Sequence, residues 1–131
     1  MKNPTTEGLQ KLARSEGYVK AADHMTAEPN SYYRGETHTP AATSPKTNEM
    51  TFYKPAFEHG YFGLVSFMDH EVVHFYINLL GIGGDTRSIE LKAYSYQMSR
   101  PAFSRLQQSD PMLHWGIQEK YERCKQEGDC E

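Results

Sequence analysis

The sequence has no apolar run of about 20 residues, the length that a membrane-spanning helix needs, and its mean hydropathy is −0.75. The first residues, Met1 to Gly17, also lack an apolar stretch that could form the core of a secretory signal peptide. We therefore expect neither a membrane span nor a signal peptide. The chain is expected to remain in the cytoplasm or to be exported as an effector by a dedicated secretion system.

Basic residues are not in excess, because 14 Lys and Arg stand against 17 Asp and Glu, which gives a net charge of −3. A nucleic-acid-binding surface normally shows a basic excess, and anionic membranes attract clusters of Lys and Arg. The charge balance thus argues against nucleic acid and against anionic membrane surfaces as partners.

Cysteine is scarce, since the only two, Cys124 and Cys130, both lie in the last eight residues. They are too few and too close together to form a disulfide framework. Two interpretations remain open, a short disulfide-closed loop at the C-terminus and two free thiols in a reducing compartment. Neither cysteine has a second Cys/His pair at zinc-finger spacing, so we expect neither to bind metal.

The length of 131 residues fits a single domain, residues 1–131. Residues 1–49 are polar and interrupted by prolines, and we expect them to be loop-rich, with one amphipathic helical stretch from Glu7 to Met25. From Met50 onward the apolar density rises, so residues 50–131 should form the catalytic core. The stretch from Met50 to Lys54, closed by Pro55, is typical of a short edge strand.

Most of the predicted core is helical. Residues 60–80 form a proline-free stretch that is apolar on most sides, which indicates a largely buried helix ended by the glycines at 81, 83 and 84. Asp85 is a suitable N-cap for a second helix over residues 86–98. Two more helices should follow, over 101–108 and after the Asp110-Pro111 pair. The predicted fold is α+β and mainly helical, with a small sheet flanking the helix over 60–80.

The buried helix contains the sequence His70-Glu71-Val72-Val73-His74, an H-E-x-x-H pattern. Residues four apart lie one above the other on a helix, so His70 and His74 can both reach one ion. Zinc accepts imidazole nitrogen at about 2.0–2.1 Å, and catalytic zinc sites have three protein ligands and a water. Glu71 is placed to accept a proton from that water as the general base.

The third ligand must come from another segment. In one known arrangement it is a histidine six residues after the second, but Leu80 occupies that position. In the other it is a glutamate on the following helix, and Glu90 lies on the predicted helix after a short glycine turn. We predict His70, His74 and Glu90 as ligands of one Zn²⁺.

The His70–His74 motif, the glycine break, and Glu90 followed by Ala93-Tyr94 resemble the glutamate zincins, metallopeptidases whose third ligand is a glutamate on the next helix. This resemblance covers roughly Met50 to Phe103 and implies a minimal zincin-like domain, in which the strand before the first helix binds extended substrate. The small size also resembles metallopeptidase toxin and effector domains of bacteria. That would imply a protein or peptide substrate, and a carrier or immunity protein as a further partner.

The chain departs from the larger thermolysin-like enzymes at one position. Those enzymes place an Asp four residues after the glutamate ligand to orient a zinc histidine, and this chain has Tyr94 there. Either Tyr94 accepts that hydrogen bond or another residue does. Hydrolysis also needs a donor for the oxyanion. We predict Tyr94 in that catalytic role, with three alternatives, Tyr96, His114 and Arg100.

These residues predict a zinc-dependent metallopeptidase with Glu71 as general base. Two alternatives remain, a zinc amidase that acts on cell-wall peptides and a non-catalytic metal-binding interaction module. Glu71 argues against the last, because a structural zinc site has no use for a general base and is usually closed by four protein ligands.

Overall fold

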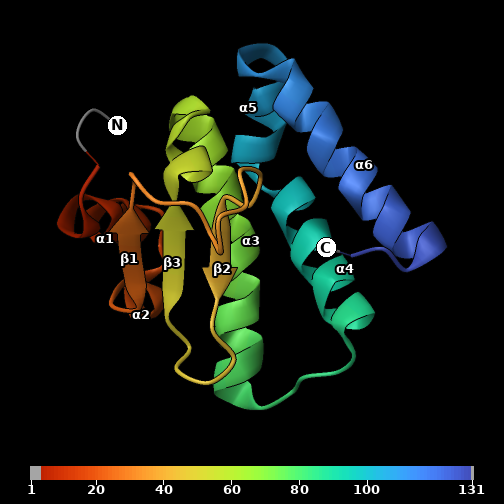
Figure 1. The fold of residues 1–131 in the computed structure, drawn as a ribbon, viewed down its shortest axis with the longest axis horizontal. Coiled ribbons are helices and arrows are strands. Elements are labelled where there is room, and N and C mark those ends of the chain that lie inside the picture. The colour runs from red at the N-terminus through yellow and green to blue at the C-terminus, as the bar shows by residue number, and fades with distance from the viewer. Residues whose placement is uncertain (1–3, 131) are drawn as a thin grey trace.

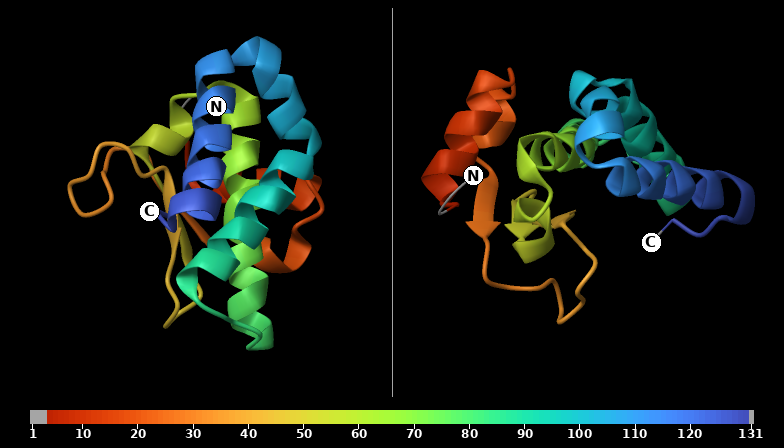
Figure 2. Two further views of the ribbon diagram at one scale, coloured as in Figure 1. Left: turned by 90° about the vertical axis from the view of Figure 1, so that its right-hand side faces the viewer. Right: turned by 90° about the horizontal axis from the view of Figure 1, so that it is seen from above.

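The structure, a computed structural model, describes residues 4–130 and confirms the predicted α+β, mainly helical class (Figure 1). A small sheet lies on one side of the long helix α3, and three further helices lie on the other side (Figure 2). The elements follow in the order α1 (Thr6–Ser15), α2 (Val19–Ala22), β1 (Met25–Glu28), β2 (Ala41–Thr43), β3 (Met50–Tyr53), a 3-10 helix (Lys54–Phe57), α3 (Gly60–Leu80), α4 (Thr86–Ser99), α5 (Pro101–Ser109) and α6 (Pro111–Glu127).

The three-stranded sheet has the order β1-β3-β2, with β1 parallel and β2 antiparallel to β3. The prediction of a strand from Met50 is therefore confirmed, but its placement at an edge is wrong, because β3 is the central strand. Pro55 misled that prediction, since it lies in the 3-10 helix after β3 and removes no hydrogen bond from the sheet. Strand β2 lies in a segment that its polar composition had marked as loop.

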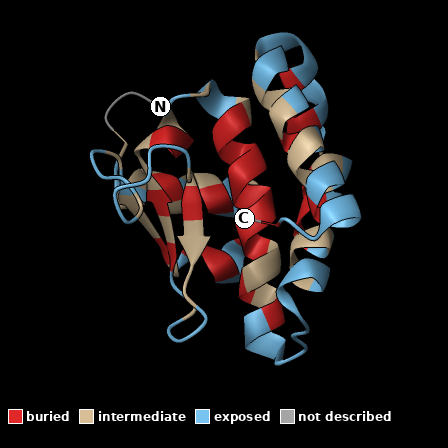
Figure 3. Cartoon of the chain, turned by 45° about the vertical axis from the view of Figure 1, so that its right-hand side comes forward, coloured by how far each residue is buried: buried red, intermediate tan, exposed pale blue. Residues whose placement is uncertain are grey.

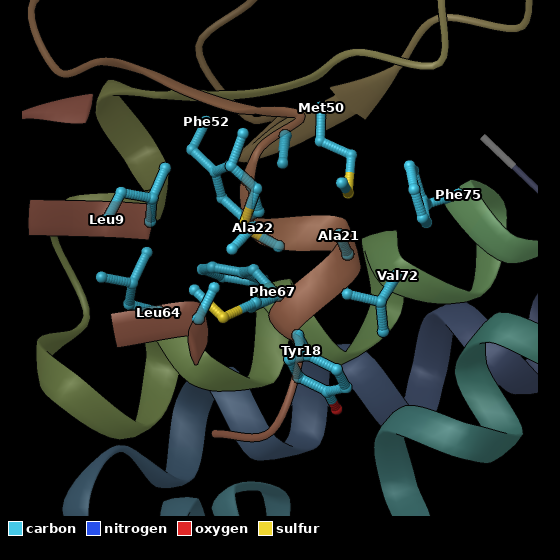
Figure 4. Close-up of a cluster of buried hydrophobic side chains, with 14 of the residues drawn as sticks. Leu9, Tyr18, Ala21, Ala22, Met50, Phe52, Leu64, Phe67, Val72 and Phe75 are labelled. Carbon is cyan, nitrogen blue, oxygen red and sulfur yellow. The ribbon is translucent and has the colours of Figure 1, made fainter. Parts of the chain in front are cut away.

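The N-terminal half contributes more structure than its composition indicated. The amphipathic stretch from Glu7 to Met25 is not one helix, because the chain turns at Gly17, whose φ of 93° favours glycine. Thr5 caps α1 by accepting a hydrogen bond from the Gly8 N–H at 3.0 Å. Leu9 and Ala13 of α1 are fully buried in a core that also takes side chains from β3 and α3 (Figure 4).

Helix α3 spans the predicted residues and is the most buried element (Figure 3). It ends at Gly81, which has a left-handed φ of 64°. Asp85 then caps α4 by accepting a hydrogen bond from the Ser88 N–H at 2.7 Å. Because α4 follows a short turn, it returns antiparallel along α3, and the two helices form the largest contact between elements.

Helices α5 and α6 complete the helical layer. Asp110 caps α6 as predicted, accepting a hydrogen bond from the Leu113 N–H at 3.2 Å, with Pro111 at the first helical position. At the other end of α6, a disulfide joins Cys124 to Cys130. Of the two states that the sequence left open for these cysteines, the structure has the disulfide-closed loop. Within the described part of the chain, no helix is both long enough and apolar enough to cross a membrane.

Candidate metal centre

The two histidines of the motif lie one helical turn apart on α3 and both face α4. Their ring centroids are 5.3 Å apart. Glu90, near the start of α4, reaches both of them. Its Oε2 lies 3.4 Å from Nε2 of His70, and its Oε1 contacts Nε2 of His74. One ligand atom from each of the three side chains lies within 4.8 Å of the others, so the predicted ligands are brought together.

This geometry fits a transition-metal ion. Ligand atoms about 2.1 Å from a tetrahedral zinc ion lie about 3.4 Å from one another. His70 and Glu90 have this separation, whereas His74 and Glu90 are in direct contact and would move apart around an ion. The two nitrogens and one carboxylate also match the ligand set that catalytic zinc prefers. Among residues 4–130, no other set of three His, Cys, Asp or Glu side chains is arranged this closely.

A buried glutamine orients the first histidine. Nδ1 of His70 lies 2.9 Å from Oε1 of Gln97, which is 2% exposed. The Gln97 amide nitrogen donates to the Ser66 hydroxyl at 3.1 Å, so its oxygen is turned toward His70. His70 must then carry its proton on Nδ1 and present Nε2 to a metal. The expectation that Tyr94 accepts this hydrogen bond is wrong, and the other expectation, that a different residue does so, is confirmed.

Sequence reasoning missed Gln97, although one signal was available. Gln97 lies seven residues, about two helical turns, after Glu90, so both point toward α3. A polar side chain two turns beyond a metal ligand on the same buried face needs a polar partner. The histidines of the facing helix were the obvious candidates for that partner.

The hydrogen bonds among the three proposed ligands shift the pKa values of Glu90 and His70. Burial would raise the pKa of Glu90, but hydrogen bonds from His70 and His74 lower it to about 2. Burial would likewise lower the pKa of His70, but its hydrogen bond to Glu90 and the charges of Glu71 and Glu90 outweigh burial, so the pKa is raised. Glu90 is thus held as a carboxylate, the form that binds metal. Metal binding would replace the protons on the imidazole Nε2 atoms.

Glu71 lies beside the three ligands without joining them. It is 7% exposed, and its Oε1 accepts a hydrogen bond of 2.8 Å from the Thr43 hydroxyl of β2. Burial lowers the pKa of His70, but the hydrogen bond to Glu90 and the charge of Glu71 outweigh burial. Burial raises the pKa of Tyr94, and the charges of Glu90 and Glu71 add to that rise. The structure therefore holds Glu71 between β2 and the metal centre.

Tyr94 is part of this site, and the three alternative donors are engaged elsewhere. The Tyr94 ring packs edge-on against His70 with centroids 4.6 Å apart, and burial followed by the Glu90 and Glu71 charges raises its pKa. No hydrogen bond joins its hydroxyl to another of residues 4–130. By contrast, the Tyr96 hydroxyl lies 2.9 Å from that of Tyr18, His114 stacks on Phe103, and Arg100 lies over the Tyr96 ring.

Asp69, the residue before the first histidine, belongs to a separate cluster. Its carboxylate accepts a hydrogen bond from the Tyr18 hydroxyl and lies 4.0 Å from Nε of Arg100. Burial raises the pKa of Asp69 to about 6, although Tyr18 and Arg100 oppose the shift. Asp69 therefore does not orient His70, whose Nδ1 contacts Gln97 instead.

Comparison with known proteins adds no family to this picture. No family model, no curated protein and no solved structure matches the chain. The functional argument therefore rests on the geometry of the metal centre and of Glu71.

Proposed function

We propose that this protein is a zinc-dependent metallopeptidase with His70, His74 and Glu90 as metal ligands and Glu71 as general base. One observation carries the proposal, a buried carboxylate that stands beside a group of three metal-binding side chains and is not one of them. A structural zinc site has no use for such a carboxylate. Three protein ligands also leave a fourth position for water, as in catalytic zinc sites.

Each residue has a defined task in hydrolysis. A zinc ion supplies Lewis-acid chemistry and lowers the pKa of a bound water to about 7. Glu71 accepts the proton that the attacking water loses and passes it to the leaving nitrogen. The carbonyl carbon thereby gains the hydroxyl group and the nitrogen gains the hydrogen as the C–N bond breaks. Tyr94 is the proposed donor to the oxyanion, because its ring packs against the proposed ligand His70 with centroids 4.6 Å apart.

The strand that would bind an extended peptide is β2 rather than β3. Since β3 is central, both of its edges are already paired, whereas β2 pairs only with β3. Thr43 at the end of β2 contacts Glu71, so a peptide added along β2 would run past the proposed base.

The Cys124–Cys130 disulfide supports the exported form of this proposal, since disulfides persist in oxidising compartments. A role as a bacterial effector toxin, with a carrier or immunity protein as partner, remains a prediction from the resemblance.

The test is metal-dependent cleavage. Purified protein should contain one zinc per chain by mass spectrometry and should cleave members of a library of unstructured peptides. Removal of zinc with a chelator should abolish cleavage, and one equivalent of zinc should restore it. Cleavage of cell-wall peptides alone would favour the amidase. Full zinc loading with no cleavage of either substrate class would favour the binding module.

A further inference from the structure

Helix α6 lies beside the metal centre, although no residue of α6 belongs to the H-E-x-x-H pattern or its third ligand. It runs antiparallel along α4 on the right-hand side of Figure 1. Two contacts fix the register. The Cys124 sulfur lies 3.9 Å from the Arg87 carbonyl oxygen, and Ile117 shares a hydrophobic cluster with Tyr94.

This register places Lys120 opposite Glu90. Lys120 lies midway along α6 between the buried residues Ile117 and Cys124. On α4, Glu90 lies midway between Arg87, which contacts Cys124, and Tyr94, which shares the hydrophobic cluster with Ile117. Residues three and four apart share a helical face, so Lys120 lies on or beside the face of α6 that packs on α4. The half-buried Lys120 is the cation that this face brings to the start of α4.

The electrostatics agree with this placement. Burial lowers the pKa of Lys120, the nearby Arg123 lowers it further, and the Glu90 carboxylate opposes both. The charge of Arg123 likewise opposes the rise that burial and the Glu90 and Glu71 charges cause in the pKa of Tyr94. The three proposed ligands include one carboxylate, that of Glu90, and the neighbouring Glu71 adds a second negative charge. A cation in this position offsets part of that charge.

We propose that Lys120 is an anion-stabilising residue of the metal centre, whose ammonium group favours binding of negatively charged groups beside His70, His74 and Glu90. This inference rests on the proposed function, in which the oxyanion of the hydrolytic intermediate must be stabilised. Lys120 would share that task with Tyr94. The sequence alone does not indicate a role for Lys120, because only the register of α4 and α6 brings it opposite Glu90.

The test uses cobalt(II), which binds to similar nitrogen and oxygen ligands and gives a visible spectrum where zinc gives none. The cobalt protein is titrated with azide, an anion, and with imidazole, a neutral ligand, and both dissociation constants are read from the spectrum. Lys120→Met should weaken azide about three- to tenfold, the effect of losing one partly screened charge nearby. Imidazole binding and cobalt affinity should change less than about twofold, and Lys120→Arg should retain azide affinity.

The matched control is Lys92→Met. Lys92 lies two residues after Glu90 but borders a groove on the other side of α4, with Val73 and Tyr76. This variant loses the same charge and should keep azide affinity. Equal weakening in both Met variants would reduce the effect to net charge and overturn the proposal. Unchanged azide binding in Lys120→Met, or weakening of azide and imidazole alike, would also overturn it. If Lys120→Met does not fold, Lys120→Gln decides by the same criteria. Failure of the wild-type protein to bind cobalt would instead contradict the metal centre itself.

Discussion

Helix α3 buries two polar clusters on opposite sides. The clusters differ in whether their side chains are arranged as metal ligands. Asp69 lies in one cluster and Glu71 in the other. Residues two positions apart in a helix point about 200° away from each other. Asp69 accepts a hydrogen bond from Tyr18 and lies 4.0 Å from Nε of Arg100, a buried nitrogen that has no hydrogen-bond partner among residues 4–130. Glu71 accepts one hydrogen bond from Thr43 and stands beside three groups that share the geometry of metal ligands.

The comparison shows why burial of a charge does not by itself identify an active site. Burial raises the pKa of Asp69 to about 6, although Asp69 does not belong to the metal centre. The two partners of Asp69 come from separate segments of the chain, since Tyr18 lies in the turn after α1 and Arg100 at the end of α4. These contacts join the N-terminal half to the helical layer, so the cluster is expected to serve stability. The other cluster is expected to serve chemistry.

The largest expected effect is at the second histidine. His74→Ala removes one of three ligands and leaves Glu90 without the partner that Oε1 contacts. Most of the zinc should be lost, while the fold persists because the hydrophobic core does not depend on His74. Mass spectrometry measures the bound zinc, and circular dichroism on the same sample measures the fold. Full zinc occupancy in this variant would mean that the ligands are misassigned.

Gln97 tests whether the orientation of His70 matters to the metal. Gln97→Leu removes the acceptor of the 2.9 Å contact with Nδ1, and loss of such a partner typically costs about 10–100-fold in metal affinity. Gln97→Glu, which still offers an oxygen to His70, is the matched variant and should bind zinc more tightly than Gln97→Leu. Competition with a zinc chelator gives both affinities. Equal zinc affinities in the wild type and the Leu variant would show that helix packing alone orients His70.

Asp69→Ala tests whether the cluster on the other side of α3 serves stability rather than metal binding. It leaves Arg100 without its nearest carboxylate and removes the acceptor of the Tyr18 hydroxyl. The free energy of unfolding should fall by about 1–3 kcal/mol, the cost of leaving a buried polar group unsatisfied. Denaturant titration measures this loss. Zinc content should stay at one per chain. Loss of zinc without loss of stability would show that the two clusters are not independent.

The smallest effect is expected at Thr43. Thr43→Val keeps the shape of the side chain but removes the hydroxyl that donates to Glu71. One hydrogen bond contributes about 0.5–1.5 kcal/mol, so kcat/KM for a cleaved peptide should change by about two- to tenfold, with zinc content unchanged. Thr43→Ser restores the hydroxyl and should restore the rate. Equal rates in all three proteins would show that Thr43 does not position the base.

The elements of the fold differ in how far they could be predicted from the sequence. The helices α3 and α4 follow from local signals, namely the glycine break after Leu80, the Asp85 cap and the spacing of His70, His74 and Glu90. Strand β2 and the order of the sheet depend on pairing between distant segments, for which three short strands give little local signal.

The contacts that cross between elements differ in how far the sequence indicates them. The spacing of Gln97 after Glu90 indicates its contact with His70, whereas the contact of Thr43 with Glu71 requires knowledge of which face of β2 meets α3. The spacing of Cys124 and Cys130 allowed a disulfide but did not require one. Its formation depends on how the chain turns back after α6.

The most direct test of the central claim is the rate of peptide hydrolysis by Glu71→Gln at full zinc occupancy. Glutamine keeps the size of the side chain and the acceptor for Thr43 but removes the basic carboxylate. Since general acid–base catalysis contributes about 10²–10⁴-fold, kcat should fall by at least about 10²-fold with the fold and the bound zinc intact. Wild-type activity in this variant, on a substrate that the zinc-free protein does not cleave, would contradict the assignment of Glu71 as the base.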